Sequence, residues 1–309
     1  MTFELPPLVE ATARSRGEEG QRWMRDLPEV VASLVEEWGL TLGTVLAGGT
    51  AALVVEATTA AGEAAVLKVA LPDRSDDAGF FDRGIAFHAL AGGHGTARLL
   101  AHDRARWATL MERLGPSLFD LDVPPAEMRV AICRCLVDLW GQPLPADAGL
   151  RDGAEKARWL GEEIERMWDA TDRPCERRTI DVVLTYVEQR IAAHDPERAV
   201  LVHGDAHEAN TLQSGDGYKL VDPEGLRSMP AHDLSVPMRG MSDDLAPDPL
   251  RLGLERAQHL HALTGVDAED IWQWGSIERV SSGLYIRTLG HDEWSEEFLS
   301  VADAWSLRR

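Results

Sequence analysis

The sequence has no long apolar run. Its 309 residues are 44% hydrophobic and 27% charged, which is ordinary for a folded globular protein. No stretch approaches the apolar length that a membrane span requires, and the opening Met-Thr-Phe-Glu lacks the basic and then apolar layout of a signal peptide. We therefore expect a cytoplasmic protein that does not insert into a membrane.

Basic residues are scarce. The chain has 31 Lys and Arg against 52 Asp and Glu, a formal net charge of −21. Such a charge argues against nucleic acid or an anionic membrane as a partner. It suits a cationic or hydroxylated small-molecule substrate, although solubility in an acid-biased proteome explains the same charge. We expect the chain to act on such a substrate as a monomer.

Cysteine is also rare. The three cysteines, Cys133, Cys135 and Cys175, cannot all pair with one another. No histidine or further cysteine lies near them at the spacing of a zinc site. We expect reduced thiols that serve only in packing.

A polar loop between two short apolar runs, residues 200–202 and 218–221, is the most informative stretch. We expect these runs to pair as a hairpin, with Gly204 allowing a tight turn after the first. The loop and its far end carry a set of polar side chains that loops rarely hold without a use: Asp205, His207, Glu208, Asn210 and Asp222. The alternative is a polar loop whose carboxylates only cap turns.

Three of these side chains fit phosphoryl transfer. That reaction needs one carboxylate to orient the attacking hydroxyl and accept its proton, and hard oxygen ligands for Mg²⁺ at the phosphates. Asp205 fits the first role, and Asn210 and Asp222 fit the second. The order His203-x-Asp205-x4-Asn210, followed by an aspartate, has the spacing of a kinase catalytic loop.

The loop reads HGD-x4-N and resembles that of the aminoglycoside phosphotransferase superfamily. Its continuation VDPEGL is similar, more narrowly, to the streptomycin 6-phosphotransferase and hydroxyurea phosphotransferase family. Residues 17–40 open with a GEEG-x2-W-x3-LP-x2-V pattern, a second point of resemblance to the streptomycin phosphotransferases. The resemblance covers nearly the whole chain. By the same resemblance, Asp233 braces the catalytic loop.

The resemblance implies an α+β, bilobal protein-kinase-like fold. Its parts would be a small N-terminal antiparallel-sheet lobe that binds nucleotide (residues 1–111), a hinge (112–116), and a larger, mainly helical lobe that binds substrate (117–309). Apolar spacing predicts a helical stretch at 18–38, broken near Leu27 by Pro28. It predicts strands at 42–47, 52–58, 64–70, 97–102 and 106–111, and helices at 76–91, 125–140, 155–168, 177–194, 249–264, 268–289 and 293–305.

A lysine in the third expected strand is a second candidate site residue. Lys68 shares a strand face with Ala64, Val66 and Ala70, where an ammonium group is uncommon unless it reaches an anion. In kinases a lysine at this place grips the nucleotide phosphates. An edge-strand lysine that discourages aggregation is the alternative.

Other nucleotide contacts are implied by the kinase pattern. Gly48 and Gly49 lie where kinases fold a glycine-rich loop over the phosphates, although the pair is not GxGxxG and an ordinary turn explains it as well. Kinases pair the strand lysine with a helical glutamate, but residues 74–95 contain none, which leaves Asp82 as the best available partner.

The segment ERLGP at 112–116 resembles the family's hinge. Backbone groups from Glu112 to Leu114 would meet the adenine edge there. Backbone recognition leaves almost no residue signature, so the sequence does not separate ATP from GTP.

The function that the resemblance implies is ATP- and Mg²⁺-dependent O-phosphorylation of a small molecule, with ATP between the lobes. An aminoglycoside or aminocyclitol antibiotic such as streptomycin is the expected acceptor. The acidic residues Asp243, Asp244 and those at 292–297 are candidates for binding its cationic groups, or are solvated faces. Hydroxyurea or an amino sugar as acceptor, and a non-catalytic nucleotide-binding module, remain alternatives.

Overall fold

The chain divides into two compact units. In the computed structural model, which describes residues 3–72 and 79–308, unit 1 comprises Met1–Gly93 with Ala97–Gly115, and unit 2 comprises His94–Thr96 with Pro116–Arg309. The border between Gly115 and Pro116 falls inside the segment predicted as a hinge. Each unit has its own hydrophobic core.

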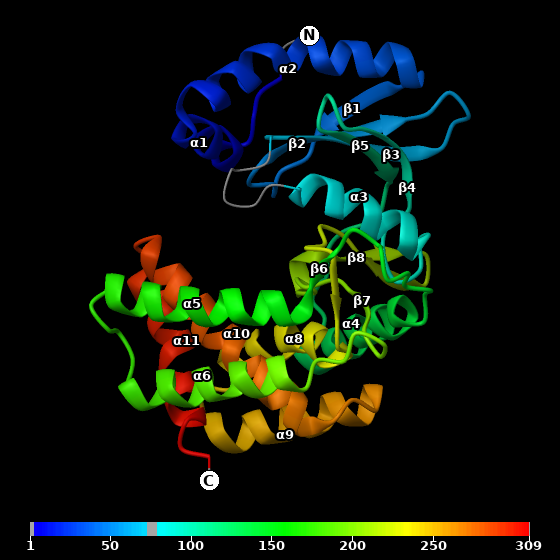
Figure 1. Ribbon diagram of the computed structural model, residues 1–309. Helices are drawn as coiled ribbons and strands as arrows, with labels where there is room; N and C mark the ends of the chain where they lie inside the picture. The colour runs from blue at the N-terminus through cyan, green and yellow to red at the C-terminus, as the bar shows by residue number, and fades with distance from the viewer. Residues whose placement is uncertain (1–2, 73–78, 309) are drawn as a thin grey trace. The chain divides into compact units, whose positions relative to one another are not determined.

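Unit 1 is built on an antiparallel sheet, as predicted. Its described part holds five strands in the order β1-β2-β3-β5-β4 (Figure 1). The strands are β1 (Thr41–Val45), β2 (Ala52–Thr58), β3 (Ala64–Ala70), β4 (Leu99–Asp103) and β5 (Ala108–Glu112). The alternation of β3 buries Ala65, Leu67 and Val69 on one face, and this face belongs to the core of the unit.

One long helix packs on that sheet. The helix α2 (Gly17–Trp38) follows α1 (Pro7–Ser15) and runs without a break through Pro28. The predicted break near Leu27 is therefore wrong. The apolar stripe continues on both sides of Pro28, and the buried Leu27, Val31 and Leu34 join the core of the sheet. This burial outweighs the backbone hydrogen bond that proline removes.

The helix predicted at 76–91 is α3 (Phe80–Ala91). Residues 76–78 of that prediction lie outside the described part of the chain. Gly79 in a left-handed conformation precedes the helix, and Gly92 in the same conformation ends it.

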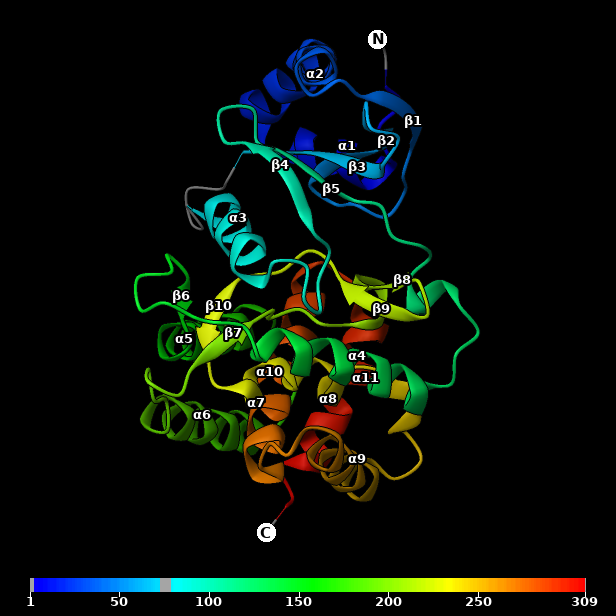
Figure 2. The ribbon, with the colours of Figure 1, turned by 90° about the vertical axis from the view of Figure 1, so that its right-hand side faces the viewer.

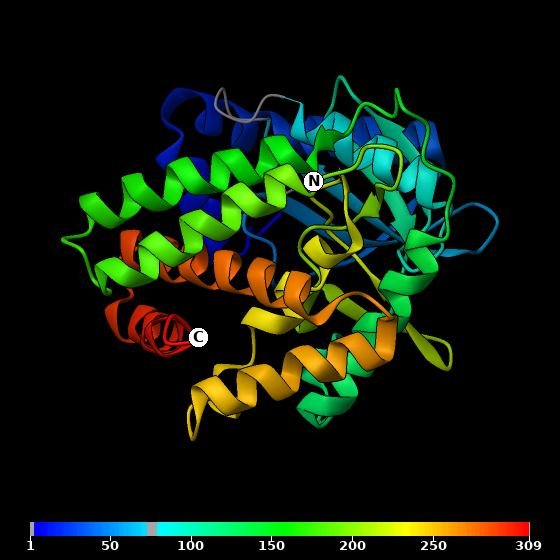
Figure 3. The ribbon, with the colours of Figure 1, turned by 60° about the horizontal axis from the view of Figure 1, so that its bottom comes forward.

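Unit 2 is mainly helical, as predicted. Its longer helices are α4 (Pro125–Trp140), α5 (Gly153–Ala170), α6 (Arg177–Ala192), α9 (Pro249–Thr264), α10 (Ala268–Thr288) and α11 (Asp292–Trp305). In Figure 3, α5 and α6 lie side by side and α10 runs next to them. Trp272 and Trp274 of α10 are buried in two different core clusters, so α10 is the central helix of the unit. Among the described helices, none is long and apolar enough to cross a membrane.

Short strands hold the polar loop of unit 2. A hairpin forms between β8 (Thr211–Ser214) and β9 (Gly217–Leu220), next to α4 (Figure 2). Separately, β7 (Val200–Val202) pairs antiparallel with β10 (Leu226–Ser228), which pairs in parallel with β6 (Arg151–Asp152). The predicted hairpin between 200–202 and 218–221 is wrong. Gly215, with a φ of 57°, reverses the chain directly after β8, so β8 becomes the partner of β9.

The three cysteines are free and buried, as predicted. Burial raises the pKa of each thiol to about 12. They therefore stay protonated at neutral pH and serve in packing.

Candidate active site

The polar loop of unit 2 begins where the buried strand β7 ends. His203 is fully buried there, and its Nδ1 accepts a hydrogen bond from the backbone N–H of Asp205 at 3.2 Å. The proton must then be on Nε2, which donates to the carbonyl of Val221 at 3.0 Å. Burial lowers the pKa of His203 to about 4, so a neutral imidazole ties the start of the loop to its end.

Asp233 stabilises the same loop by hydrogen bonds to its backbone. It lies on α7 (Pro230–Asp233) and is fully buried. Its Oδ1 accepts from the N–H of Gly204 at 2.8 Å, and its Oδ2 accepts from the N–H of His203 at 3.2 Å and from Nε1 of Trp140 at 2.8 Å. The contacts agree with the bracing role that the resemblance implies for Asp233.

Gly204 makes the turn after β7 possible. Its φ is +86°, a backbone conformation that residues other than glycine rarely adopt. A Cβ atom at this position would also lie 3.0 Å from the Cβ of Glu224 and 3.2 Å from Cδ1 of Leu226. Glycine is therefore required where the chain turns toward Asp205.

The carboxylate of Asp205 is held from two sides. Its Oδ2 accepts from Nδ2 of Asn210 at 3.2 Å, and its Oδ1 accepts from Nη2 of Arg239 at 3.3 Å. Nε2 of His207 lies 3.5 Å from Oδ2, and 39% of the Asp205 side chain is exposed. The carboxylate is thus fixed and still reachable by a ligand.

Neighbouring charges set the protonation state of Asp205. Burial alone would raise its pKa, but the hydrogen bond and charge of His207 and the charge of Arg239 outweigh burial and lower the pKa to about 2. The side chain is a carboxylate at any physiological pH. It can accept a hydrogen bond from a hydroxyl but is a weak base.

Asn210 and Asp222 are brought together by the backbone. The carbonyl of Asn210 accepts from the N–H of Val221 at 2.9 Å, which places Asp222 one residue farther along. The side-chain Nδ2 of Asn210 also donates to the carbonyl of Asp205 at 3.0 Å. Because a carbonyl only accepts, this contact fixes the amide and turns the Asn210 Oδ1 away from Asp205.

Asp222 has an unusual backbone conformation. Its φ is +59°, which is rare for a non-glycine residue, and proline follows it. Strain of this kind is typical of functional sites. An amide oxygen and a carboxylate are ligands that suit Mg²⁺, which takes its remaining ligands from water and phosphates. In the residues that the structure describes, no three His, Cys, Asp or Glu side chains gather into a metal-binding cluster.

Lys68 occupies the middle strand of the sheet of unit 1. It lies opposite Val54 of β2 and Thr109 of β5, on the face away from Leu67 and Val69. Gly48, with a φ of +106°, and Gly49 lie in the connection between β1 and β2. Their contact with a nucleotide stays a prediction.

Asp82 lies in the first turn of α3, and its Oδ1 is 2.9 Å from Nε of Arg104. Its expected pairing with Lys68 stays a prediction. Glu112 is the last residue of β5, and its N–H donates to the carbonyl of Arg98 at 2.9 Å. Leu114 follows beyond the end of β5, and its contact with the adenine stays a prediction.

The structure adds charged residues next to Asp205 that the sequence analysis missed. Arg239 ends α8 (Ser235–Arg239), and its Nε lies 4.0 Å from Oε2 of Glu278 on α10. Nζ of Lys156 on α5 donates to Oε1 of Glu224 at 2.8 Å. The local sequence around Arg239 and Glu278 carries no motif that would single them out.

The acidic residues proposed for cationic groups are already paired in part. Oδ2 of Asp244, in η4 (Ser242–Asp244), lies 3.0 Å from Nη1 of Arg129 and 3.7 Å from Nη2 of Arg256. Oδ1 of Asp292 lies 3.2 Å from Nη1 of Arg287. These contacts favour a structural role for both acids.

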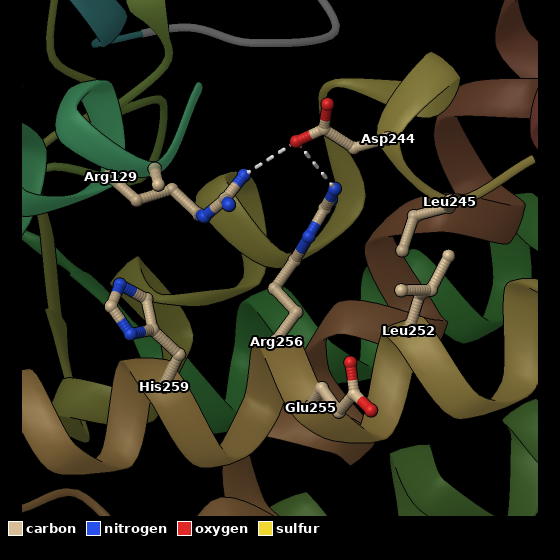
Figure 4. A pocket seen from close by; sticks show the side chains of 8 residues that line it. Arg129, Asp244, Leu245, Leu252, Glu255, Arg256 and His259 are labelled. Atoms are coloured by element: carbon tan, nitrogen blue, oxygen red, sulfur yellow. Dashed lines mark hydrogen bonds and ion pairs between the residues drawn. The ribbon is translucent and has the colours of Figure 1, made fainter. Parts of the chain in front are cut away.

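A cavity of about 300 Å³ lies between α4, η4 and α9. Figure 4 shows that Arg129 and Arg256 both point toward Asp244 across it. Arg256 also donates to the carbonyls of Met238 and Met241, at 3.0 and 3.1 Å. Arg256 of the cavity wall therefore holds the main chain on both sides of Arg239.

Comparisons with known proteins agree with the resemblance. The model of a family described as aminoglycoside/hydroxyurea antibiotic resistance kinase matches residues 37–290. A streptomycin 6-kinase of Streptomyces glaucescens is 32% identical over 282 residues, which are 89% of this chain and 88% of that protein. A hydroxyurea phosphotransferase of Kitasatospora aureofaciens is 32% identical over 239 residues, 75% of this chain and 66% of that protein.

Solved structures share the fold at lower identity. An aminoglycoside phosphotransferase in ternary complex with ADP and hygromycin B superposes with a TM-score of 0.59 at 14% identity. The match covers 89% of this chain and 97% of that one. The predicted kinase-like fold is thereby confirmed.

Proposed function

The chain belongs to the aminoglycoside/hydroxyurea antibiotic resistance kinase family, and on this premise we propose that it transfers the γ-phosphoryl group of ATP to a hydroxyl of a cationic antibiotic. It is a phosphotransferase with an alcohol group as acceptor. An aminocyclitol such as streptomycin is the acceptor that its relatives favour.

One observation carries the proposal. The side chains of Asp205 and Asn210 are hydrogen-bonded to each other. The backbone carbonyl of Asn210 accepts a hydrogen bond from Val221, the residue before Asp222. These contacts support a site in which the Asp205 carboxylate accepts a hydrogen bond from the substrate hydroxyl and Asn210 and Asp222 supply oxygen ligands for a metal, as phosphoryl transfer requires.

The chemical step follows from this arrangement. The acceptor hydroxyl, hydrogen-bonded to the Asp205 carboxylate, attacks the γ-phosphorus of ATP. A new oxygen–phosphorus bond forms, the bond to the β,γ-bridging oxygen breaks, and ADP leaves with that electron pair. The hydroxyl proton passes to Asp205. Because the pKa of Asp205 is about 2, the proton moves only when the forming bond has made the hydroxyl acidic.

The remaining residues bind and orient the nucleotide. Asn210 Oδ1 and the Asp222 carboxylate would hold Mg²⁺, which neutralises charge on the phosphates when it is bound. Lys68 of unit 1 would contribute a further positive charge to the phosphates, and backbone groups near Leu114 would meet the adenine. Alignment and charge neutralisation account for catalysis.

Hydroxyurea is the second candidate acceptor. The observation that favours it is the hydroxyurea phosphotransferase relative, which is as similar in identity, 32%, as the streptomycin 6-kinases. The streptomycin 6-kinase of Streptomyces glaucescens matches over a longer part of both chains, 89% and 88%, and therefore ranks first.

Growth of an antibiotic-sensitive bacterial host tests the proposal. A host that expresses the protein should grow at streptomycin concentrations that stop a host expressing Asp205→Asn. Asp216→Asn, in the exposed turn between β8 and β9, is the matched control and should protect like the wild type. If all three strains were equally sensitive to streptomycin and the wild-type protein protected only against hydroxyurea, streptomycin would be excluded and hydroxyurea would be the acceptor.

A further inference from the structure

We propose that Arg239 is a positioning and specificity residue: its guanidinium occupies one side of the Asp205 carboxylate, so that a cationic acceptor presents a hydroxyl to Asp205 and not a positively charged group. The inference rests on the proposed function, because it concerns how a polycationic substrate meets this carboxylate.

The contacts place Arg239 between two acids. Nη2 of Arg239 is 3.3 Å from Oδ1 of Asp205, and Nε is 4.0 Å from Oε2 of Glu278. The Arg239 side chain is 19% exposed and that of Glu278 is 12% exposed, whereas 39% of Asp205 is exposed. The guanidinium is therefore buried on the side of Glu278, and Asp205 is the most exposed of the three side chains.

The backbone of Arg239 is held on both sides. Its carbonyl accepts from Nη1 of Arg279, which is fully buried on α10. Arg256 of α9 donates to the carbonyls of Met238, Gly240 and Met241 around it. Two buried arginines thus fix the main chain from which Arg239 reaches Asp205, and the contact does not depend on a mobile loop.

In a site that binds a cationic substrate, an exposed carboxylate alone does not select a hydroxyl of the substrate over its positively charged groups. Ammonium and guanidinium groups bind carboxylates by charge-assisted hydrogen bonds, which are stronger than the hydrogen bond of a neutral hydroxyl. If such a group paired with Asp205, the reacting hydroxyl would lie elsewhere. Arg239 already donates a hydrogen bond to Oδ1 of Asp205, and its positive charge repels a second cation. Asn210 donates a hydrogen bond to Oδ2. The remaining lone pairs can accept from a hydroxyl without bringing in a further charge.

The test compares kcat and KM for streptomycin in three variants. Arg239→Gln removes the charge, Arg239→Lys keeps it, and Arg190→Gln alters an arginine of similar burial that pairs with Asp270 outside the site. Removal of an interaction that prevents unproductive binding lowers kcat while KM stays equal or falls. We expect kcat of Arg239→Gln to fall on the order of 10²-fold without an increase in KM. Arg239→Lys should recover kcat to within about tenfold, and Arg190→Gln should resemble the wild type.

A binding measurement separates this inference from the proposed function. Methylguanidinium, titrated by NMR, should bind Arg239→Gln at least about tenfold more tightly than the wild type. The gain should disappear when Asp205→Asn is added. This result needs no turnover, so it decides the inference even if the wild type phosphorylates none of the acceptors tested.

Loss of folding is controlled by a double variant. Arg239→Gln with Glu278→Gln removes both members of the buried pair and leaves no unpaired buried charge. It should show the same gain in methylguanidinium binding. A rise in KM at unchanged kcat, or equal methylguanidinium binding in the wild type and the folded variants, would overturn the inference.

Discussion

Asp233→Asn should impair catalysis much more than stability at neutral pH. The carboxylate accepts hydrogen bonds from three N–H groups, one at Oδ1 and two at Oδ2. An amide has a single oxygen, so it can accept the hydrogen bonds of only one of these two positions. If its oxygen replaces Oδ2, its NH2 group faces the N–H of Gly204, where the bond is now 2.8 Å. One lost charge-assisted bond and one unsatisfied buried donor cost roughly 2–5 kcal/mol together.

A second contribution opposes this loss. Burial raises the pKa of Asp233 to about 6 from an ordinary value of 3.8, and a shift of that size corresponds to about 3 kcal/mol of destabilisation when the group is ionised. Asparagine has no charge to bury. The free energy of unfolding at pH 7 should therefore fall by only about 0–2 kcal/mol. The displaced Gly204 amide should nevertheless misplace Asp205 and lower kcat by about 10²-fold.

The pH dependence gives the sharper comparison. Because the folded pKa of Asp233 lies above the unfolded one, the native wild type takes up a proton between pH 6 and 3.8 and becomes more stable relative to the variant. In urea unfolding, the stability difference should grow to roughly 2–4 kcal/mol near pH 4. A difference that stays constant with pH, or an unchanged kcat, would refute the reasoning.

Four further predictions follow from individual contacts. Gly204→Ala should lower the free energy of unfolding by about 1–3 kcal/mol in chemical denaturation, because its φ is +86° and the new Cβ would lie 3.0 Å from a neighbouring side chain; Gly265→Ala, at φ +74° with no atom within 4 Å, should cost less. Burial lowers the pKa of His232 to about 3, so protonation of the unfolded chain removes stability as the pH falls from 6.5 toward 3; His232→Phe should reduce the slope of unfolding free energy against pH in that window by up to about 1.4 kcal/mol per unit. Lys68→Met should raise the KM for ATP about tenfold or more in steady-state assays, and an unchanged KM would exclude it as a phosphate contact. Asp222→Ala should raise the Mg²⁺ concentration for half-maximal activity about tenfold or more, as measured by magnesium titration at saturating ATP.

Local patterns predicted the elements and the central loop well. The helices expected at 125–140 and 249–264 are α4 and α9, and the strands expected at 52–58 and 64–70 are β2 and β3. Asp205 and Asn210 are five residues apart and contact each other within one short loop, so their spacing sufficed.

Features that depend on packing between distant segments could not be predicted. Arg239 reaches Asp205 across 34 residues, and the contact depends on where α8 lies, which Arg256 and Arg279 determine. The continuous α2 and the pairing of β7 with β10 have the same origin, since tertiary burial and strand pairing overrode a local proline and an apparent hairpin.

The most direct test of the account is ADP release by the purified protein with ATP and Mg²⁺, in the presence of streptomycin, other aminoglycosides, hydroxyurea or amino sugars. The account predicts that streptomycin stimulates ADP release with formation of an equal amount of phosphorylated acceptor, and that Asp205→Ala lowers this rate by about 10²–10⁴-fold while nucleotide binding persists. No stimulation by any acceptor, with ATP binding intact, would contradict it and favour a nucleotide-binding module.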